Sequence, residues 1–206
     1  MSGTIQARLN RGYGIAASRL GAPYGQYRET GPLYPLNNSM GWLFVDFDRD
    51  PRFSHKSPNA WGHPTYYGLF DATNVLVGDY LVGPYGAFFV GNTEPDKPPL
   101  LVLCNRKITV TRPAPTGPYS GDTLPETTLM AGWPASVLTK SRGDRAQEHL
   151  PGDTRIGWYE CLLPVWPSVE INEADRVIDE NGTVYTVSST ELTPLGWRLA
   201  IEQAAP

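Results

Sequence analysis

Three histidines are the residues of this 206-residue chain that could most easily bind a metal or transfer a proton near neutral pH. His55, His63 and His149 lie in three separate loop-like stretches, and the first two flank a short segment that contains proline. Neither a cysteine nor a second acidic cluster completes a set of three or four ligands beside them. We therefore expect surface histidines, and we predict no metal site and no cofactor.

Aspartates suggest two other kinds of site. Asp46, Asp48 and Asp50 alternate as in a calcium-binding loop, but the glycine at the sixth position and the glutamate at the twelfth are missing. This pattern therefore predicts a solvated turn. Asp79 and Asp175 each precede an apolar strand pattern, and an aspartate at such a place commonly accepts backbone N–H groups of a turn. We expect that structural role for both.

Motifs of nucleophilic and phosphate chemistry are missing from the sequence. No serine occupies a Gly-x-Ser-x-Gly elbow, and no glycine-rich phosphate-binding loop occurs. Cys104 and Cys161 lie in apolar strand patterns, which favours buried thiols and leaves a disulfide open. We predict no catalytic residue and a non-enzymatic protein, with a hydrolase that depends on His63 or Asp79 as the third-ranked alternative.

Six tryptophans could supply the flat rings that sugar-binding sites and protein interfaces use. Trp61 and Trp133 stand beside glycine or proline, so a carbohydrate-binding or cell-wall-binding β-protein that uses these rings is an alternative. Trp158 and Trp197 lie inside strand patterns, where core packing is favoured.

The composition favours a β-rich fold with many turns. The chain has 21 Gly and 20 Pro and only 18% charged residues, which disfavours a helical bundle, while 40% hydrophobic residues suffice for a core. A net charge of −4 without a clustered basic face predicts no sequence-specific nucleic-acid binding. No run of about eighteen apolar residues occurs, so we predict no membrane partner and synthesis in a cytoplasm.

A weak internal repeat organises the chain. An apolar strand, a Gly-containing turn and a second strand follow Asp79, and the same order recurs 96 positions later after Asp175. Within this alignment Gly86 matches Gly182 without a gap. Asn181-Gly182 between apolar runs is a strong hairpin signal. The repeat predicts two copies of one small β-module.

The N-terminal region predicts a helix followed by an extended arm. Apolar residues repeat at three- and four-residue steps over residues 4–20, and a helix this short and Gly-weakened must dock on another surface. Residues 22–38 show neither helical nor strand periodicity and contain several Pro and Gly. Apolar side chains of the helix and arm are our candidates for subunit contacts: Ile5, Leu9, Tyr13, Leu20, Tyr24, Tyr27, Leu33 and Tyr34.

The predicted fold is mainly β. It consists of two related small β-barrel or sandwich modules with an N-terminal helix, an extended arm and long Pro/Gly loops. The expected boundaries are residues 1–62 for the helix and arm, 63–111 for the first module, 112–154 for a linker and loop insertion, and 155–206 for the second module.

Several of these stretches resemble virion structural proteins of tailed bacteriophages, of the head–tail connector, collar or tail-completion type. The resemblance rests on the segments 78–82 and 174–178, each followed by a Gly turn and an apolar strand, and on the closing stretch 184–199. The helix at residues 5–20 with Gln26-Tyr27-Arg28 behind it is also similar to prophage structural proteins. A duplicated module departs from the single-barrel connectors.

The resemblance implies a non-enzymatic subunit of a homo-oligomeric ring in the phage neck, which contacts other neck or tail proteins. The expected location is the virion, after synthesis in the host bacterial cytoplasm. A baseplate or tail-hub component is the alternative within the same class.

Overall fold

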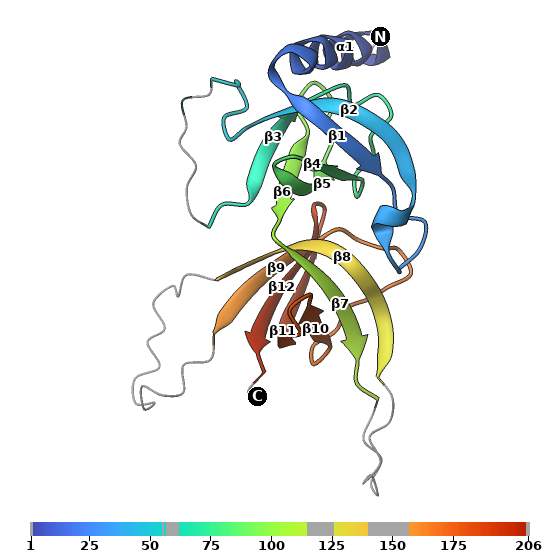
Figure 1. Cartoon of the computed structure of the whole chain (residues 1–206), viewed down its shortest axis with the longest axis vertical. Helices are drawn as coiled ribbons and strands as arrows, with labels where there is room; N and C mark the ends of the chain where they lie inside the picture. Colours follow the sequence, from blue (N-terminus) through green and yellow to red (C-terminus); the bar gives the residue numbers. More distant parts are fainter. Residues whose placement is uncertain (1, 55, 57–61, 115–125, 140–156, 205–206) are drawn as a thin grey trace, which may run out of the picture.

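The computed structural model describes residues 2–54, 56, 62–114, 126–139 and 157–204, and it describes the side chains from Ile5 onward. One helix precedes two closed β-barrels (Figure 1). The prediction of a mainly β protein with an N-terminal helix and two related barrel modules is therefore confirmed.

The first barrel consists of six antiparallel strands in the order β1-β2-β3-β6-β5-β4, and β1 pairs with β4 to close it. The bounds of its strands are Ala22–Tyr27 for β1, Ser39–Asp48 for β2, Thr65–Leu69 for β3, Tyr80–Gly83 for β4, Gly86–Asn92 for β5 and Leu100–Cys104 for β6. A short 3-10 helix, Pro35–Asn37, lies between β1 and β2.

The second barrel repeats this arrangement strand by strand. Its order is β7-β8-β9-β12-β11-β10, and β7 pairs with β10 to close it. The bounds are Arg106–Arg112 for β7, Thr127–Thr139 for β8, Trp158–Leu163 for β9, Arg176–Asp179 for β10, Val184–Thr193 for β11 and Gly196–Gln203 for β12. Each barrel thus joins its first strand to its fourth, so the chain contains one topology twice in tandem.

The strands of each barrel cross the module boundaries expected from the sequence. The predicted arm at 22–38 contains β1, which belongs to the first barrel together with β2. The end of the predicted first module, residues 100–111, is divided at Asn105, and the part after Asn105 is in β7 of the second barrel. The predicted insertion contains β8, a full strand of that barrel.

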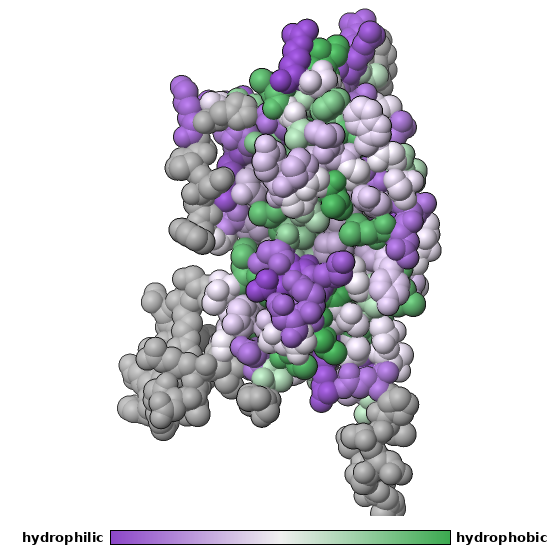
Figure 2. Space-filling model, in the orientation of Figure 1, coloured by the Kyte–Doolittle hydropathy of each residue, from purple (hydrophilic) through white to green (hydrophobic). Residues whose placement is uncertain are grey.

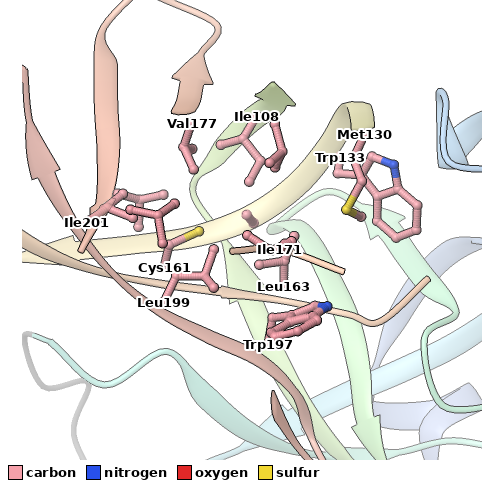
Figure 3. Packing of buried hydrophobic residues seen from close by; sticks show 14 of the residues in the cluster. Ile108, Met130, Trp133, Cys161, Leu163, Ile171, Val177, Trp197, Leu199 and Ile201 are labelled. Carbon is pink, nitrogen blue, oxygen red and sulfur yellow. The ribbon is translucent and has the colours of Figure 1, made fainter. Parts of the chain in front are cut away.

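Each barrel is filled by apolar side chains from all around its wall. In the first, the buried side chains include Tyr24, Leu81, Phe88 and Leu101. In the second, Ile108, Met130, Leu163, Val177 and Leu199 come from five different strands and point toward a common interior (Figure 3). Closure leaves no unpaired sheet edge in either barrel, which removes the usual route to strand addition.

The two barrels pack into one unit through β8. The ring of Tyr80 in the first barrel lies edge-on against Trp133, with centroids 6.2 Å apart, and its hydroxyl donates to the Pro134 carbonyl at 2.9 Å. Trp133 Nε1 donates to the carbonyl of Pro32 at 2.6 Å. The side-chain amide of Asn105 exchanges two hydrogen bonds with the backbone of Val137. Aromatic packing and hydrogen bonds to residues of β8 therefore hold the two barrels together.

Helix α1, Ser2–Leu20, lies across β2 and β3 at the far end of the first barrel (Figure 1). The predicted helix is confirmed. Small residues make its contact with the barrel: Ala17 is fully buried, and a Cβ at Gly14 would lie 3.0 Å from Cβ of Asp71. Directly after the helix, a Cβ at Gly21 would lie 2.3 Å from the Val45 carbonyl oxygen. The helix thus approaches the barrel wall through these small residues and through Asn10, which is 7% exposed and donates to Thr73 Oγ1 at 3.5 Å.

Candidate functional site

Asp79 has a structural partner that sequence reasoning did not find. Its carboxylate accepts two hydrogen bonds from Arg28, from Nε at 2.7 Å and from Nη2 at 2.7 Å. The backbone N–H of Leu76 and the side chain of Gln26 also donate to this carboxylate. Arg28 follows β1 and Asp79 precedes β4, so the ion pair joins the two strands that close the first barrel.

Asp175 and Arg112 repeat this arrangement in the second barrel. The two guanidinium–carboxylate distances are both 2.8 Å, and the Asn172 N–H donates to the same carboxylate at 2.8 Å. The hydrogen bond to aspartate raises the pKa of Arg112, and the same contact raises that of Arg28. The expected acceptance of a backbone N–H by each aspartate is confirmed. With their arginines, these buried carboxylates hold the barrels closed.

The solvated turn predicted for the alternating aspartates is wrong for Asp46 and Asp48, which lie in β2, where Asp48 is buried; Asp50 lies in the turn that follows the strand. The Asp50 N–H donates to Asp48 Oδ1 at 3.0 Å, and Asp50 in turn accepts from the Arg52 N–H and from the Ser54 hydroxyl. These hydrogen bonds of Asp50 lower the pKa of its carboxyl group.

Possible metal ligands do not gather in the part of the chain that the structure describes: no three His, Cys, Asp or Glu side chains there could hold an ion together. His63 is exposed, whereas His55 and His149 lie outside the described residues.

Both cysteines are free thiols, which answers the question of a disulfide for this structure. Cys161 is fully buried, and burial raises the pKa of its thiol to about 12. Cys104 is half-buried, and burial of its sulfur also raises its pKa. Neither thiol is poised as a nucleophile, because the reactive form is the thiolate.

The tryptophans are distributed differently from the expected pattern. Trp133 is fully buried, so it cannot serve as the exposed sugar platform considered from the sequence, and Trp61 lies outside the described residues. Trp197 is buried as predicted, whereas Trp158 is partly exposed. Among the tryptophans that the structure describes, Trp42 is the most exposed, at 69%, on the outer face of β2.

The apolar stripe of α1, defined as Ile5, Leu9, Tyr13, Ala16 and Leu20, is only partly buried. With about 100° of rotation per residue, these five positions follow one line along the helix, to the side of the small residues that contact the barrel. Ile5 is 57% exposed and Leu20 is 65% exposed, while Leu9, Tyr13 and Ala16 are half-buried. Green residues lie among purple ones at this end of the molecule (Figure 2). An apolar helix face is thus left at the surface.

A second apolar surface lies on the other side of α1. A hollow of about 310 Å³ opens there, and it is lined by Arg11, Gly14, Ile15, Ser18, Leu43, Phe44 and Asp71. The ring of Trp42 stands edge-on to the ring of Phe44, with centroids 5.4 Å apart. Met40, two residues before Trp42, is also exposed. We call Ile15, Met40, Trp42 and Phe44 the tryptophan patch. Sequence reasoning missed it because the apolar run 41–47 did not reveal which side chains point outward.

The other interface candidates fall into two groups. Leu33 and Tyr34 are exposed, although their backbone is held on β8 by the hydrogen bond from Tyr34 N–H to the Ala131 carbonyl. Tyr24 is 1% exposed in the core of the first barrel, and Tyr27 packs against the core between the barrels. Tyr24 is therefore corrected from an interface candidate to a core residue, because β1 is a barrel strand and its side chain points inward.

No helix among the described residues is long and apolar enough to span a membrane. Comparisons of this chain with protein-family models, with curated proteins and with solved structures found no match.

Proposed function

We propose that this protein is a non-enzymatic structural subunit that assembles with further copies of itself through helix α1, as a ring in the neck of a tailed phage. The observation that carries this proposal is the apolar stripe of α1, which stays at the surface although the helix is docked. Single exposed apolar residues are common on monomers, but a continuous apolar line along a helix favours a protein contact.

Burial of the stripe would contribute substantially to an assembly. Fully burying one large aliphatic side chain stabilises by about 1.5–3 kcal/mol, and Ile5 and Leu20 still expose more than half of their surface. An isolated helix of this length with three glycines is marginal in water, so its contact with a rigid body matters. The closed barrel below α1 supplies that rigid support.

The double barrel itself suits a rigid structural subunit better than an enzyme. Its buried carboxylates Asp79 and Asp175 are engaged by arginines and backbone groups that close the barrels. The junction adds hydrogen bonds and aromatic packing between the two barrels. These features favour a subunit that holds a fixed shape while its surface contacts neighbours.

The placement in a phage neck rests on the sequence resemblance. The best-matching stretch, 184–199, forms the β11–β12 hairpin and the turn within it. A baseplate or tail-hub position is the alternative that the same resemblance allows.

Labelling purified phage particles with an antibody to this chain tests the proposal. Label at the junction of head and tail is expected. Label at the distal end of the tail would replace the neck by the baseplate, and particles that carry the chain nowhere would contradict a virion role. A matched control uses particles from a phage whose gene for this chain is deleted and supplied in trans with an epitope tag.

A further inference from the structure

We infer that helix α1 opens and closes as a separate unit while the first barrel stays closed, and that contact with a neighbouring subunit holds the helix in its docked position. The opening follows from the contacts between α1 and the barrel wall, which lie at one end of the molecule (Figure 1). The locking by a neighbour rests on the proposed assembly function.

The first barrel is complete without the helix. Pairing of β1 with β4 closes its wall, and its core cluster includes Tyr24, Phe70 and Leu101, all of which follow α1 in the chain. Among the described residues, neither hydrophobic core cluster contains a side chain of α1. Release of the helix therefore removes no side chain from a core, and the barrel does not have to unfold with it.

The contact between α1 and the barrel is small and largely polar. Of the α1 side chains that the structure describes, only those of Asn10 and Ala17 are buried. Asn10 Nδ2 donates to Thr73 Oγ1 at 3.5 Å, and Gln6 Oε1 accepts the Asp96 N–H at 2.7 Å. When the helix leaves, water replaces each of these partners, so such hydrogen bonds contribute little net free energy to docking.

Packing between α1 and β2 is also incomplete. The hollow of about 310 Å³ lies between them, with Gly14 and Ile15 on the helix side and Leu43 and Phe44 on the strand side. Atoms that line a gap lack the dispersion contacts of a close-packed interface. Ile15 accordingly remains 50% exposed although the helix is docked. Docking therefore removes little apolar surface from water.

A helix that leaves the barrel does not persist in water. It has 19 residues, three of them glycine, and a helix of this kind is marginal in isolation. The open state is therefore an unfolded N-terminal segment attached to a closed barrel. Segments with few buried apolar contacts open at free energies well below that of global unfolding. A neighbour that contacts the apolar stripe binds only the folded, docked helix, so it shifts the population towards that state.

Hydrogen exchange of the native protein, measured by mass spectrometry at a concentration where the chain is monomeric, tests the opening. The α1 amides should exchange at least about a hundredfold faster than those of β5 and β6, because they need only the local opening. Val90 and Leu101, both fully buried, mark these reference strands. Equal protection of α1 and the two strands would overturn the inference.

A disulfide between the helix and the barrel supplies a matched pair of states. A Cβ at Gly14 would lie 3.0 Å from Cβ of Asp71, so Gly14→Cys/Asp71→Cys reaches the roughly 3.5–4.5 Å of a disulfide with a small shift. The oxidised variant should exchange its α1 amides several-fold more slowly than the same variant in its reduced form. If oxidation, verified by mass, leaves this exchange unchanged, fast exchange does not require release and the opening is overturned.

Exchange at rising protein concentration tests the locking. Self-association should slow the exchange of α1 several-fold and leave that of β5 and β6 unchanged. Association without slower exchange of α1 would overturn the locking and leave the assembly function standing. A wild-type chain that stays monomeric at every concentration would overturn the assembly function and the locking together, while exchange in the monomer still decides whether α1 opens separately.

Discussion

Arg28 donates two hydrogen bonds to Asp79 across the seam of the first barrel, which is the pairing of β1 with β4 that closes it. Arg112 donates two hydrogen bonds to Asp175 across the corresponding seam of the second barrel, between β7 and β10. In each case the arginine also donates to a backbone carbonyl of the loop before the fourth strand, that of Asn74 or of Glu170. The arginine thus ties the end of the first strand both to the aspartate and to the loop that leads into it.

Replacing Arg28 by Met should destabilise the first barrel strongly. Only 1% of the Asp79 side chain is exposed, so the change leaves a buried carboxylate without its cation, at a cost of about 3–5 kcal/mol. Urea unfolding of the purified variant measures the loss. The exposed pair Arg198–Glu160 is the control, because Arg198→Met should cost less than about 1 kcal/mol. Equal losses for the two variants would contradict the seam role.

Two glycines at the helix should respond to alanine with opposite signs. A Cβ at Gly21 would meet the Val45 carbonyl oxygen at 2.3 Å, so Gly21→Ala must push the helix end off the barrel and should cost about 1–3 kcal/mol. Gly12 has open space at this position, so Gly12→Ala should stabilise by up to about 1 kcal/mol through helix propensity. Thermal unfolding of both variants provides the measurement. If Gly21→Ala is harmless, α1 does not dock as described.

Glu29 should make the protein less stable as the pH rises. Burial raises the pKa of its carboxyl above the ordinary value of 4.5, and the nearby charge of Asp79 acts in the same direction. The folded state therefore binds this proton more tightly than the unfolded state, and the stabilisation is lost as pH rises through the folded pKa. Glu29→Gln should accordingly be more stable than the wild type at pH 7 and lose that advantage towards pH 4.

Urea unfolding midpoints of the wild type and Glu29→Gln, taken across this pH range, provide the test. Glu94→Gln is the control, because hydrogen bonds from Lys97 and Asn92 lower the pKa of that carboxyl on an exposed turn. The Glu29 assignment fails if the difference between Glu29→Gln and wild type is the same at both ends of the range.

The thiol of Cys161 should resist alkylation in the folded protein. It is fully buried with its pKa raised to about 12, so almost no thiolate is present at pH 8. Mass spectrometry after iodoacetamide treatment should find Cys161 unmodified in buffer and fully modified in denaturant. Cys104, which is half-buried, should react at an intermediate rate. Rapid native labelling of Cys161 would mean that the second barrel opens readily.

The sequence allowed prediction of those elements whose local signals agree with their environment. The helix at 4–20 could be predicted because its apolar residues recur at helical spacing. The turn at Asn181-Gly182 could be predicted because glycine readily adopts a positive φ, and Gly182 has a φ of 81° there. The equivalence of Asp79 and Asp175 was also found, since both stand before the fourth strand of their barrels.

Other strands were missed for identifiable physical reasons. In β1 the inward positions are Tyr24 and Gln26, and a buried glutamine bound to Asp79 breaks the alternation of apolar and polar residues. In β8, Gly132 and Pro134 look like strand breakers. Gly132 has a positive φ of 72° beside the ring of Tyr34, while the Pro134 carbonyl accepts the Tyr80 hydroxyl at the junction. These residues serve tertiary contacts, which local patterns do not report.

The surface of α1 could be predicted only in part. The apolar stripe was visible in the sequence, but the side of the helix that docks is chosen by the small residues Gly14 and Ala17. The partners of the two arginines were hidden as well, because Arg28 lies 51 residues from Asp79 and Arg112 lies 63 residues from Asp175. No common spacing therefore marked the pairs.

Sedimentation velocity of the wild type and of the double variant Ile5→Gln/Leu20→Gln, over a wide range of concentrations, tests the central claim most directly. Both side chains are exposed, so the variant should keep its fold, and an unchanged far-ultraviolet circular dichroism spectrum checks this. We expect the wild type to form oligomers as its concentration rises and the variant to remain monomeric. Identical sedimentation of the two proteins would contradict assembly through the apolar stripe of α1.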